Sequence, residues 1–171
     1  MSGQRHPVLS LLLCMGLGMS PARVWAVNPQ MTGTWVLDLE ASDSNQPLLK
    51  AQGVNLVVRT AARGMAVTQR ITVAADTVTV EVESSLRSQT KQLTTDNKVR
   101  SVSGEKGTAP VRHYWSDDDS LVSIAGTKID GIAGQMIVDR SLSADGKTLT
   151  QKITLEQPSG NIVTNRVFRR Q

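Results

Sequence analysis

The 171-residue sequence has little of the chemistry on which most catalytic and metal sites depend. It contains one cysteine, Cys14, and two histidines, His6 and His113. A single cysteine excludes an internal disulfide, and the usual zinc and copper sites need several histidine or cysteine ligands. The sequence also has no nucleophile-elbow or phosphate-loop motif. We therefore expect no catalytic residue, no metal and no cofactor.

Aromatic residues and net charge are also scarce. Phe, Trp and Tyr make up 3% of the chain, and the formal net charge is +4. A charge this small gives no argument for a nucleic-acid partner. The aspartates at 117–119 lack the spaced ligands and the glycine of a calcium loop, so they predict a charged hairpin turn. His113, beside Tyr114 and Trp115, is interpreted as a strand residue.

Only one long hydrophobic run is present, and it lies near the N-terminus. The apolar residues 8–19 follow a charged start, have the length of a signal-peptide core and are too few to span a bilayer. Cleavage after Ala26 makes residues 1–26 a signal peptide and residues 27–171 one domain. An uncleaved anchor and a lipoprotein modified at Cys14 are the alternatives. We expect a periplasmic or secreted protein.

The chain does contain a strand signal that repeats between turn residues. The alternating apolar series are Val67-Ile71-Val73, Val78-Val80-Val82, Met136-Val138-Leu142 and Ile153-Leu155. The turn signals are Ala75-Asp76, Asp96-Asn97, Asp130-Gly131, Asp145-Gly146 and Ser159-Gly160. This pattern predicts an all-β protein of about ten strands joined as sequential hairpins, and such a meander protects its edges by closing into an up-and-down β-barrel. A ten-strand barrel is too wide for side chains to fill, so we expect a cavity lined by aliphatic residues.

Residues 45–65 interrupt the strand pattern with two short helical segments. Ser44 or Asn45 can cap the first segment, and Gly53 can end it in the left-handed conformation. Asn55 can cap the second. The alternative for residues 54–58 is a strand. The two helices fall between the first and second strands, where a helix-turn-helix lid can cover the mouth of the barrel.

Four segments resemble, in the same order, those of a known family. They are the opening Gly33-Thr34-Trp35, the helix-turn-helix 48–65, the hairpin 76–84 and the ending Asn165-Arg166-Val167-Phe168. On these segments the chain resembles the fatty-acid-binding protein family of the calycin superfamily. A looser relationship, to exported bacterial lipocalin-like proteins, is the alternative.

The resemblance implies a ten-strand calycin-type barrel with the lid described above and a long-chain fatty acid or similar amphiphile inside. That family holds the ligand carboxylate with two arginines and a tyrosine from the last strands. Matched to this sequence, the arginines fall on Arg140 and Arg166 and the tyrosine on Phe168. Phenylalanine has no hydroxyl group, so one hydrogen bond to the ligand is lost.

The strand pattern is a second, independent reason to expect that these two arginines bind a ligand. Arg140 alternates in phase with Met136 and Val138, and Arg166 in phase with Phe168. If this phase faces inward, both cations are buried and need a partner. A ligand carboxylate fits, because guanidinium binds it in a bidentate fork. The alternatives are outward-pointing arginines, or neutralisation by an internal acid or water.

We therefore predict a non-enzymatic carrier that binds a fatty acid or other apolar molecule. The predicted ligand-binding residues are Arg140, Arg166, Phe168, Met136 and Val138. Lys50, Arg59 and Arg63 on the lid are predicted either to touch anionic membranes transiently or to form a solvated helix face. We expect a monomer. The alternative function is a lipocalin-like envelope interaction or stress protein without a small-molecule ligand.

Overall fold

The computed structural model describes residues 27–104, 107–129 and 132–171. The predicted signal peptide, residues 1–26, and the predicted turn at Asp130-Gly131 lie outside them. The helices are η1 (Pro29–Met31), α1 (Gln46–Ala51) and α2 (Leu56–Ala62). The strands are β1 (Gly33–Asp38), β2 (Val67–Ala74), β3 (Thr77–Ser84), β4 (Ser88–Thr94), β5 (Arg100–Gly104), β6 (Gly107–Trp115), β7 (Leu121–Ile129), β8 (Ile132–Leu142), β9 (Thr148–Glu156) and β10 (Ile162–Arg170).

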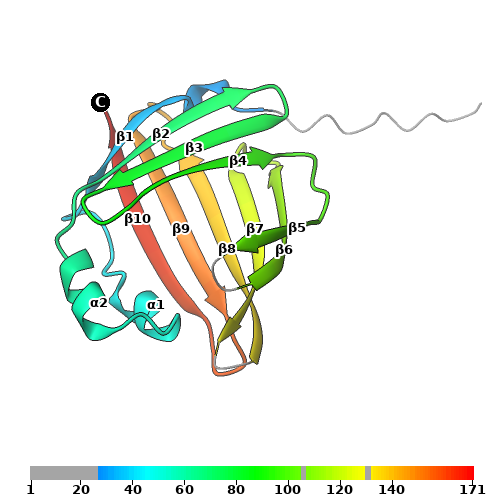
Figure 1. The fold of residues 1–171 in the computed structure, drawn as a ribbon. Helices are drawn as coiled ribbons and strands as arrows, with labels where there is room; N and C mark the ends of the chain where they lie inside the picture. Colours follow the sequence, from blue (N-terminus) through cyan, green and yellow to red (C-terminus); the bar gives the residue numbers. More distant parts are fainter. Residues whose placement is uncertain (1–26, 105–106, 130–131) are drawn as a thin grey trace, which may run out of the picture.

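The ten strands form one antiparallel sheet in the order β4-β3-β2-β1-β10-β9-β8-β7-β6-β5. Every strand pairs with its neighbour in sequence except across the β4–β5 connection, and β1 pairs with β10. The sheet curls around an interior face, and α1 and α2 lie at one end of it (Figure 1). The predicted all-β, ten-strand up-and-down architecture with a helix pair between β1 and β2 is confirmed.

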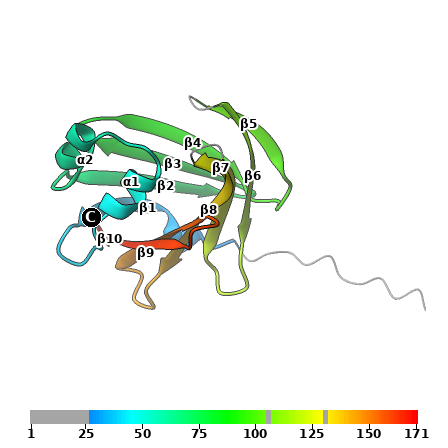
Figure 2. The same cartoon turned by 90° about the horizontal axis from the view of Figure 1, so that it is seen from below.

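The hydrogen-bonded ladder does not close, because β4 and β5 are its two ends. The chain after β4 is instead anchored elsewhere. The backbone N–H of Thr95 donates to the carbonyl of Asp76 (2.7 Å), and that of Asn97 donates to the carbonyl of His113 (3.0 Å). A bridge between Asp96 and Tyr114 is the result. The curled sheet therefore brings β4 next to β6 without pairing β4 to β5 (Figure 2).

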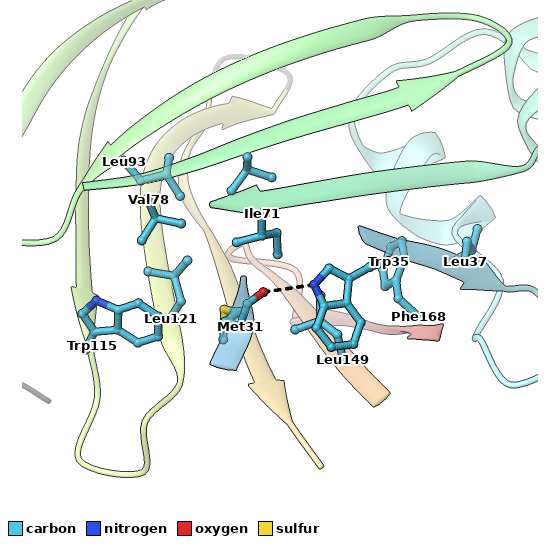
Figure 3. Close-up of a cluster of buried hydrophobic side chains, with 11 residues drawn as sticks. Met31, Trp35, Leu37, Ile71, Val78, Leu93, Trp115, Leu121, Leu149 and Phe168 are labelled. Carbon is cyan, nitrogen blue, oxygen red and sulfur yellow. Dashed lines mark hydrogen bonds between the residues drawn. The ribbon is translucent and has the colours of Figure 1, made fainter. Parts of the chain in front are cut away.

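A packed cluster of apolar side chains fills the end of the fold around Trp35. This cluster, here called the closed end, consists of Met31, Trp35, Leu37, Ile71, Val78, Val80, Leu93, Trp115, Leu121, Leu149 and Phe168 (Figure 3). Trp35 is fully buried, and its indole Nε1 donates to the carbonyl of Met31 (3.1 Å). The Arg170 guanidinium lies 4.3 Å from the centroid of the Trp35 ring. Burial of this apolar surface is the main source of stability.

The two lid helices begin and end close to the capping residues that the sequence predicts, with small differences. Gly53 has a φ of 73°, as the end of α1 requires. The Asn55 side chain accepts from the backbone N–H of Val58 (3.0 Å), and α2 begins at Leu56, so the strand alternative for residues 54–58 is wrong. The N-terminus of α1 is held by Ser44, whose hydroxyl accepts from Gln46 (3.3 Å), while the Asn45 side chain makes no capping bond.

In the described part of the chain, neither helix is long and apolar enough to cross a membrane.

Candidate functional site

The sheet register shows which side chains share the inner face. Arg140 of β8 lies opposite Gln151 of β9, and Gln151 lies opposite Arg166 of β10. Directly opposed residues of an antiparallel pair project to the same face, and so do residues two apart along a strand. Phe168, two residues from Arg166, is buried in the closed end. Arg140 and Arg166 therefore both face the interior, on either side of Gln151.

The inner face has two parts that differ in burial. Side chains of the closed end have almost no accessible surface. Further along the same strands, Gln69, Leu155 and Thr164 are still buried, but other inward-facing side chains are half-buried or exposed. This second set, here called the open interior, comprises Lys91, His113, Ser123, Met136, Val138, Arg140, Gln151, Ile153 and Arg166. These inward-pointing side chains keep accessible surface, so they are less tightly packed than those of the closed end.

The lid lies over the far side of the open interior. Along β8 the inward residues run from Met136 through Val138 and Arg140 to Leu142, which packs against the closed end. Met136 is the residue nearest the lid, because the side-chain amide of Gln52 contacts its Sδ at 3.4 Å. Helix α1 also contacts β10, and its Leu48 is buried. The open interior is thus bounded by the closed end on one side and by the lid on the other.

The two inward arginines have no ion-pair partner among the residues that the structure describes. Burial lowers the pKa of Arg140 to about 10, an effect that the charge of Asp139 only partly offsets. The Nε of Arg140 is buried and makes no hydrogen bond. Burial also lowers the pKa of Arg166. Within residues 27–104, 107–129 and 132–171, neither guanidinium forms an ion pair, so no internal acid of this part neutralises them.

A polar bridge crosses the interior between these arginines and the closed end. The Gln69 side chain on β2 donates through Nε2 to Oε1 of Gln151 on β9 (3.0 Å). Gln69 is 3% exposed, and its own Oε1 has no hydrogen-bond partner. A buried carbonyl without a donor is costly. The carbonyl oxygen of Gln69 and the Nε of Arg140 are therefore two buried polar atoms whose hydrogen bonding is unsatisfied.

Two further residues on the inner face were not among the predicted site residues, although His113 was correctly interpreted as a strand residue. Lys91 on β4 lies opposite Val80, a buried residue of the closed end, so it is on the inner face. His113 on β6 lies opposite Ser123, and its Nδ1 is 2.9 Å from the Ser123 hydroxyl. Burial, and then the charge of Arg140, lower the pKa of His113 to about 4, so the ring is neutral at pH 7. The in-phase spacing of Lys91 with Leu93 was the available sequence signal.

The other predicted site residues fall in different surroundings. Met136 and Val138 line the open interior, as their phase suggests. Phe168 is 2% exposed and packs in the closed end. Its ring therefore has little accessible surface left with which to contact a ligand. Whether any of these residues binds a ligand stays a prediction.

The lid exposes both apolar and cationic side chains. Leu56 and Val57, at the start of α2, are 65% and 79% exposed. Lys50 and Arg63 are exposed as well. Arg59 is half-buried, and its backbone carbonyl accepts from Nε2 of Gln46 on α1 (2.7 Å). Arg59 therefore helps to join the two helices, while the other two cations face outward.

No group of three His, Cys, Asp or Glu side chains that could hold a metal ion occurs among the described residues.

Solved structures of other proteins share this fold. Lipid binding protein 8 of Caenorhabditis elegans matches with a TM-score of 0.69 at 18% identity, over 85% of this chain and 99% of that protein. A fatty-acid-binding protein from brain tissue of Drosophila melanogaster matches with a TM-score of 0.63 at 18% identity, over 80% and 95%. Fatty-acid-binding protein 1 of Echinococcus granulosus matches with a TM-score of 0.64 at 11% identity, over 82% and 97%.

The comparisons establish the fold. No protein-family model and no curated protein match the sequence. At identities of 11% to 18% the likeness is one of architecture alone. The resemblance drawn from the sequence, to the fold of the fatty-acid-binding proteins, is confirmed at that level.

Proposed function

Since the chain folds as the fatty-acid-binding proteins do, we propose that it is a non-enzymatic carrier of a fatty acid or a similar amphiphile. The apolar tail occupies the open interior, and the acidic head group binds Arg140 and Arg166. One observation carries the proposal: two inward guanidinium groups flank Gln151 with no ion-pair partner in the described part of the chain. An unpaired inward cation is unfavourable unless something of opposite charge joins it.

The expected energetics divide between tail and head group. Each buried methylene contributes about 0.8 kcal/mol, so a chain of about fifteen gives on the order of 12 kcal/mol before ordering costs are subtracted. The tail therefore supplies most of the affinity. The arginines set the orientation of the ligand and the preference for an acid over an alcohol, because charge-assisted bonds to guanidinium are strong and directional.

The proposal includes export and a monomeric state. Residues 8–19 have the length and apolarity of a signal-peptide core, which supports a periplasmic or secreted carrier. Expression of the full chain in a bacterial host tests this proposal. A mature N-terminus at Val27 in the exported fraction is the expected result, and full-length protein retained in the membrane would contradict it.

The lid is the proposed entrance for the ligand. The helix pair exposes the apolar Leu56 and Val57 together with Lys50, and exposed Arg63 follows α2, a combination that suits brief contact with an anionic membrane surface. The double variant Leu56→Ser and Val57→Ser should slow ligand transfer to anionic vesicles and leave equilibrium affinity unchanged. Equal transfer rates for variant and wild type would remove the membrane contact from the proposal.

Binding of matched lipids tests the carrier function. Hexadecanoic acid and hexadecanol are titrated into the wild type and the Arg166→Met variant, and native mass spectrometry tests for a lipid that copurifies. Arg166→Met should weaken binding of the acid about tenfold more than binding of the alcohol, as expected for loss of one charge-assisted contact. Arg70→Met is the matched control, because Arg70 is exposed near Glu83, at 4.0 Å, on the outer face.

Two results would contradict the proposal. A protein that binds neither lipid and copurifies with none is not a carrier. That result would favour the alternative of an envelope interaction or stress protein without a small-molecule ligand. Equal losses for acid and alcohol would show that Arg166 makes no head-group contact.

A further inference from the structure

A third cation faces the interior from the opposite side of the fold. Lys91 lies on β4, between Gln89 and Leu93 in the inward phase, and Leu93 is buried in the closed end. Its position opposite Val80 gives the same orientation. Because β4 is at one end of the ladder and β8 and β10 are well separated from it, Lys91 approaches the interior from a different direction than the two arginines.

The positive charge of Arg140 affects the pKa of Lys91. Burial lowers the pKa of the Lys91 amino group, and the charges of Arg140 and Arg87 lower it further. His113, on β6 between them in the curl, has its pKa lowered by Arg140 and by Lys91 as well. The register places Lys91 and Arg140 on the inner face of the sheet, and the charge of Arg140 acts on the Lys91 amino group.

The described carboxylates near β4 and β5 have other partners or face outward. Asp96 accepts two hydrogen bonds of 2.7 Å from the guanidinium of Arg100, through both of its oxygens. Glu81 and Glu83 of β3 lie opposite outward residues of β2, including Arg70. Lys91, like Arg140 and Arg166, has no ion pair in the part of the chain that the structure describes.

We propose that the head group held in the open interior is a phosphate monoester, bound jointly by Lys91, Arg140 and Arg166. This inference rests on the carrier function and specifies its ligand. A carboxylate brings one charge and two oxygens in one plane, which leaves a surplus of cations. A phosphate monoester brings close to two charges and three terminal oxygens that point in three directions. Three cations from three strands match that arrangement, and Lys91 is the residue that decides between the two head groups.

Three ligands with the same tail separate the possibilities. Hexadecyl phosphate, hexadecanoic acid and hexadecanol are titrated into the wild type, Lys91→Gln and the outward-facing control Lys152→Gln. The phosphate should bind the wild type about tenfold more tightly than the acid. Lys91→Gln should abolish most of that difference and leave the alcohol unaffected, Lys91→Arg should restore it, and Lys152→Gln should behave as the wild type.

Phosphorus NMR gives a second measurement that does not depend on affinity. The second pKa of a phosphate monoester is about 6 in water, and three neighbouring cations should hold the bound phosphate fully ionised below that pH. Titration of the bound signal should therefore show a lowered pKa in the wild type and a smaller shift in Lys91→Gln.

The failure of this inference differs from the failure of the carrier function. Equal affinity for phosphate and acid, or equal loss of all three ligands in Lys91→Gln, would overturn the phosphate assignment while the protein remains a carrier. Failure to bind any of the three ligands would overturn both. Thermal unfolding of each variant shows that it is folded before binding is compared.

Discussion

Arg166 and Arg170 lie four residues apart on the same strand, but their side chains differ in the contacts that they make. Arg170 stacks over Trp35 at 4.3 Å and donates to the carbonyls of Thr32 (2.9 Å) and Gly146 (2.8 Å). Arg166 is half-buried, its pKa is lowered by burial, and it has no ion pair within the described residues. One arginine completes the closed end, and the other leaves its charge facing the open interior.

The comparison extends to the neighbouring side chains. At the closed end Nε1 of Trp35 is hydrogen-bonded, and a Cβ on Gly33 would lie 2.7 Å from Nη1 of Arg170, so a larger residue there would displace the guanidinium. In the open interior, Arg140 Nε and Gln69 Oε1 have no partner. Nε1 of Trp115 in the closed end also lacks a partner, so the two ends differ mainly in how tightly their side chains are packed.

The largest expected effect comes from removing the centre of the closed end. Trp35→Ala deletes a fully buried ring and should lower the free energy of unfolding by about 3–5 kcal/mol. Urea denaturation followed by far-UV circular dichroism measures the change. A loss below about 1 kcal/mol would mean that the closed end is not the main source of stability.

Adding the same volume to both regions should give different results. Val78→Phe overfills the closed end and should reduce the free energy of unfolding by about 1–3 kcal/mol. Val138→Phe adds a ring to the open interior and should leave stability nearly unchanged while it weakens ligand binding. Denaturation and lipid titration of both variants check this. Equal destabilisation by the two substitutions would show that the interior is filled.

Neutralising the two arginines should separate structure from binding. Arg170→Met removes the stacking contact and the carbonyl bonds, so we expect a loss of about 1–2 kcal/mol in the free energy of unfolding. Arg166→Met removes an unpaired cation, so the ligand-free protein should be no less stable than the wild type. Thermal unfolding in the absence of lipid measures the stability of both variants. A larger loss of stability in Arg166→Met than in Arg170→Met would contradict the distinction between a structural and a binding arginine.

A further expected effect is the pH dependence of stability. His113 has a pKa of about 4 in the folded protein against 6.5 when unfolded, so the unfolded state binds more protons between these values. The free energy of unfolding should therefore fall as pH decreases from 6.5 to 4. The His113→Gln variant should lose this part of the slope, while the acidic groups that titrate lower remain. An identical slope in variant and wild type would show that His113 is not buried among cations.

Local patterns in the sequence predicted much of the fold. The alternation of Val67, Ile71 and Val73 and the turn at Asp145-Gly146, where Gly146 has a φ of 65°, depend on neighbouring residues alone. The same is true of the Asn55 cap. Residues 54–58 suit a strand and a helix almost equally by composition, and the cap at Asn55 decides for the helix. Ser44, not Asn45, holds the start of α1, since one residue of displacement lies beyond what capping preferences resolve.

The candidate site was predicted in part. Arg140 and Arg166 stood out because each is in phase with apolar residues on a clearly alternating strand. Lys91 did not, because β4 is mostly polar and its alternation is weak. Gln69 sits in an apolar strand, but its partner Gln151 lies 82 residues away, and only the register of the sheet places them together.

By itself the sequence determined the strand periodicity, the turns and the helix pair, because these follow from backbone preferences and from the spacing of apolar residues. Only the tertiary structure decided which inward side chains are packed and which line open space. It also decided that cations from β4, β8 and β10 share one space, which follows from the curl of the sheet. The physical reason is that burial and electrostatic coupling depend on distances between strands, and those distances exist only once the sheet has formed.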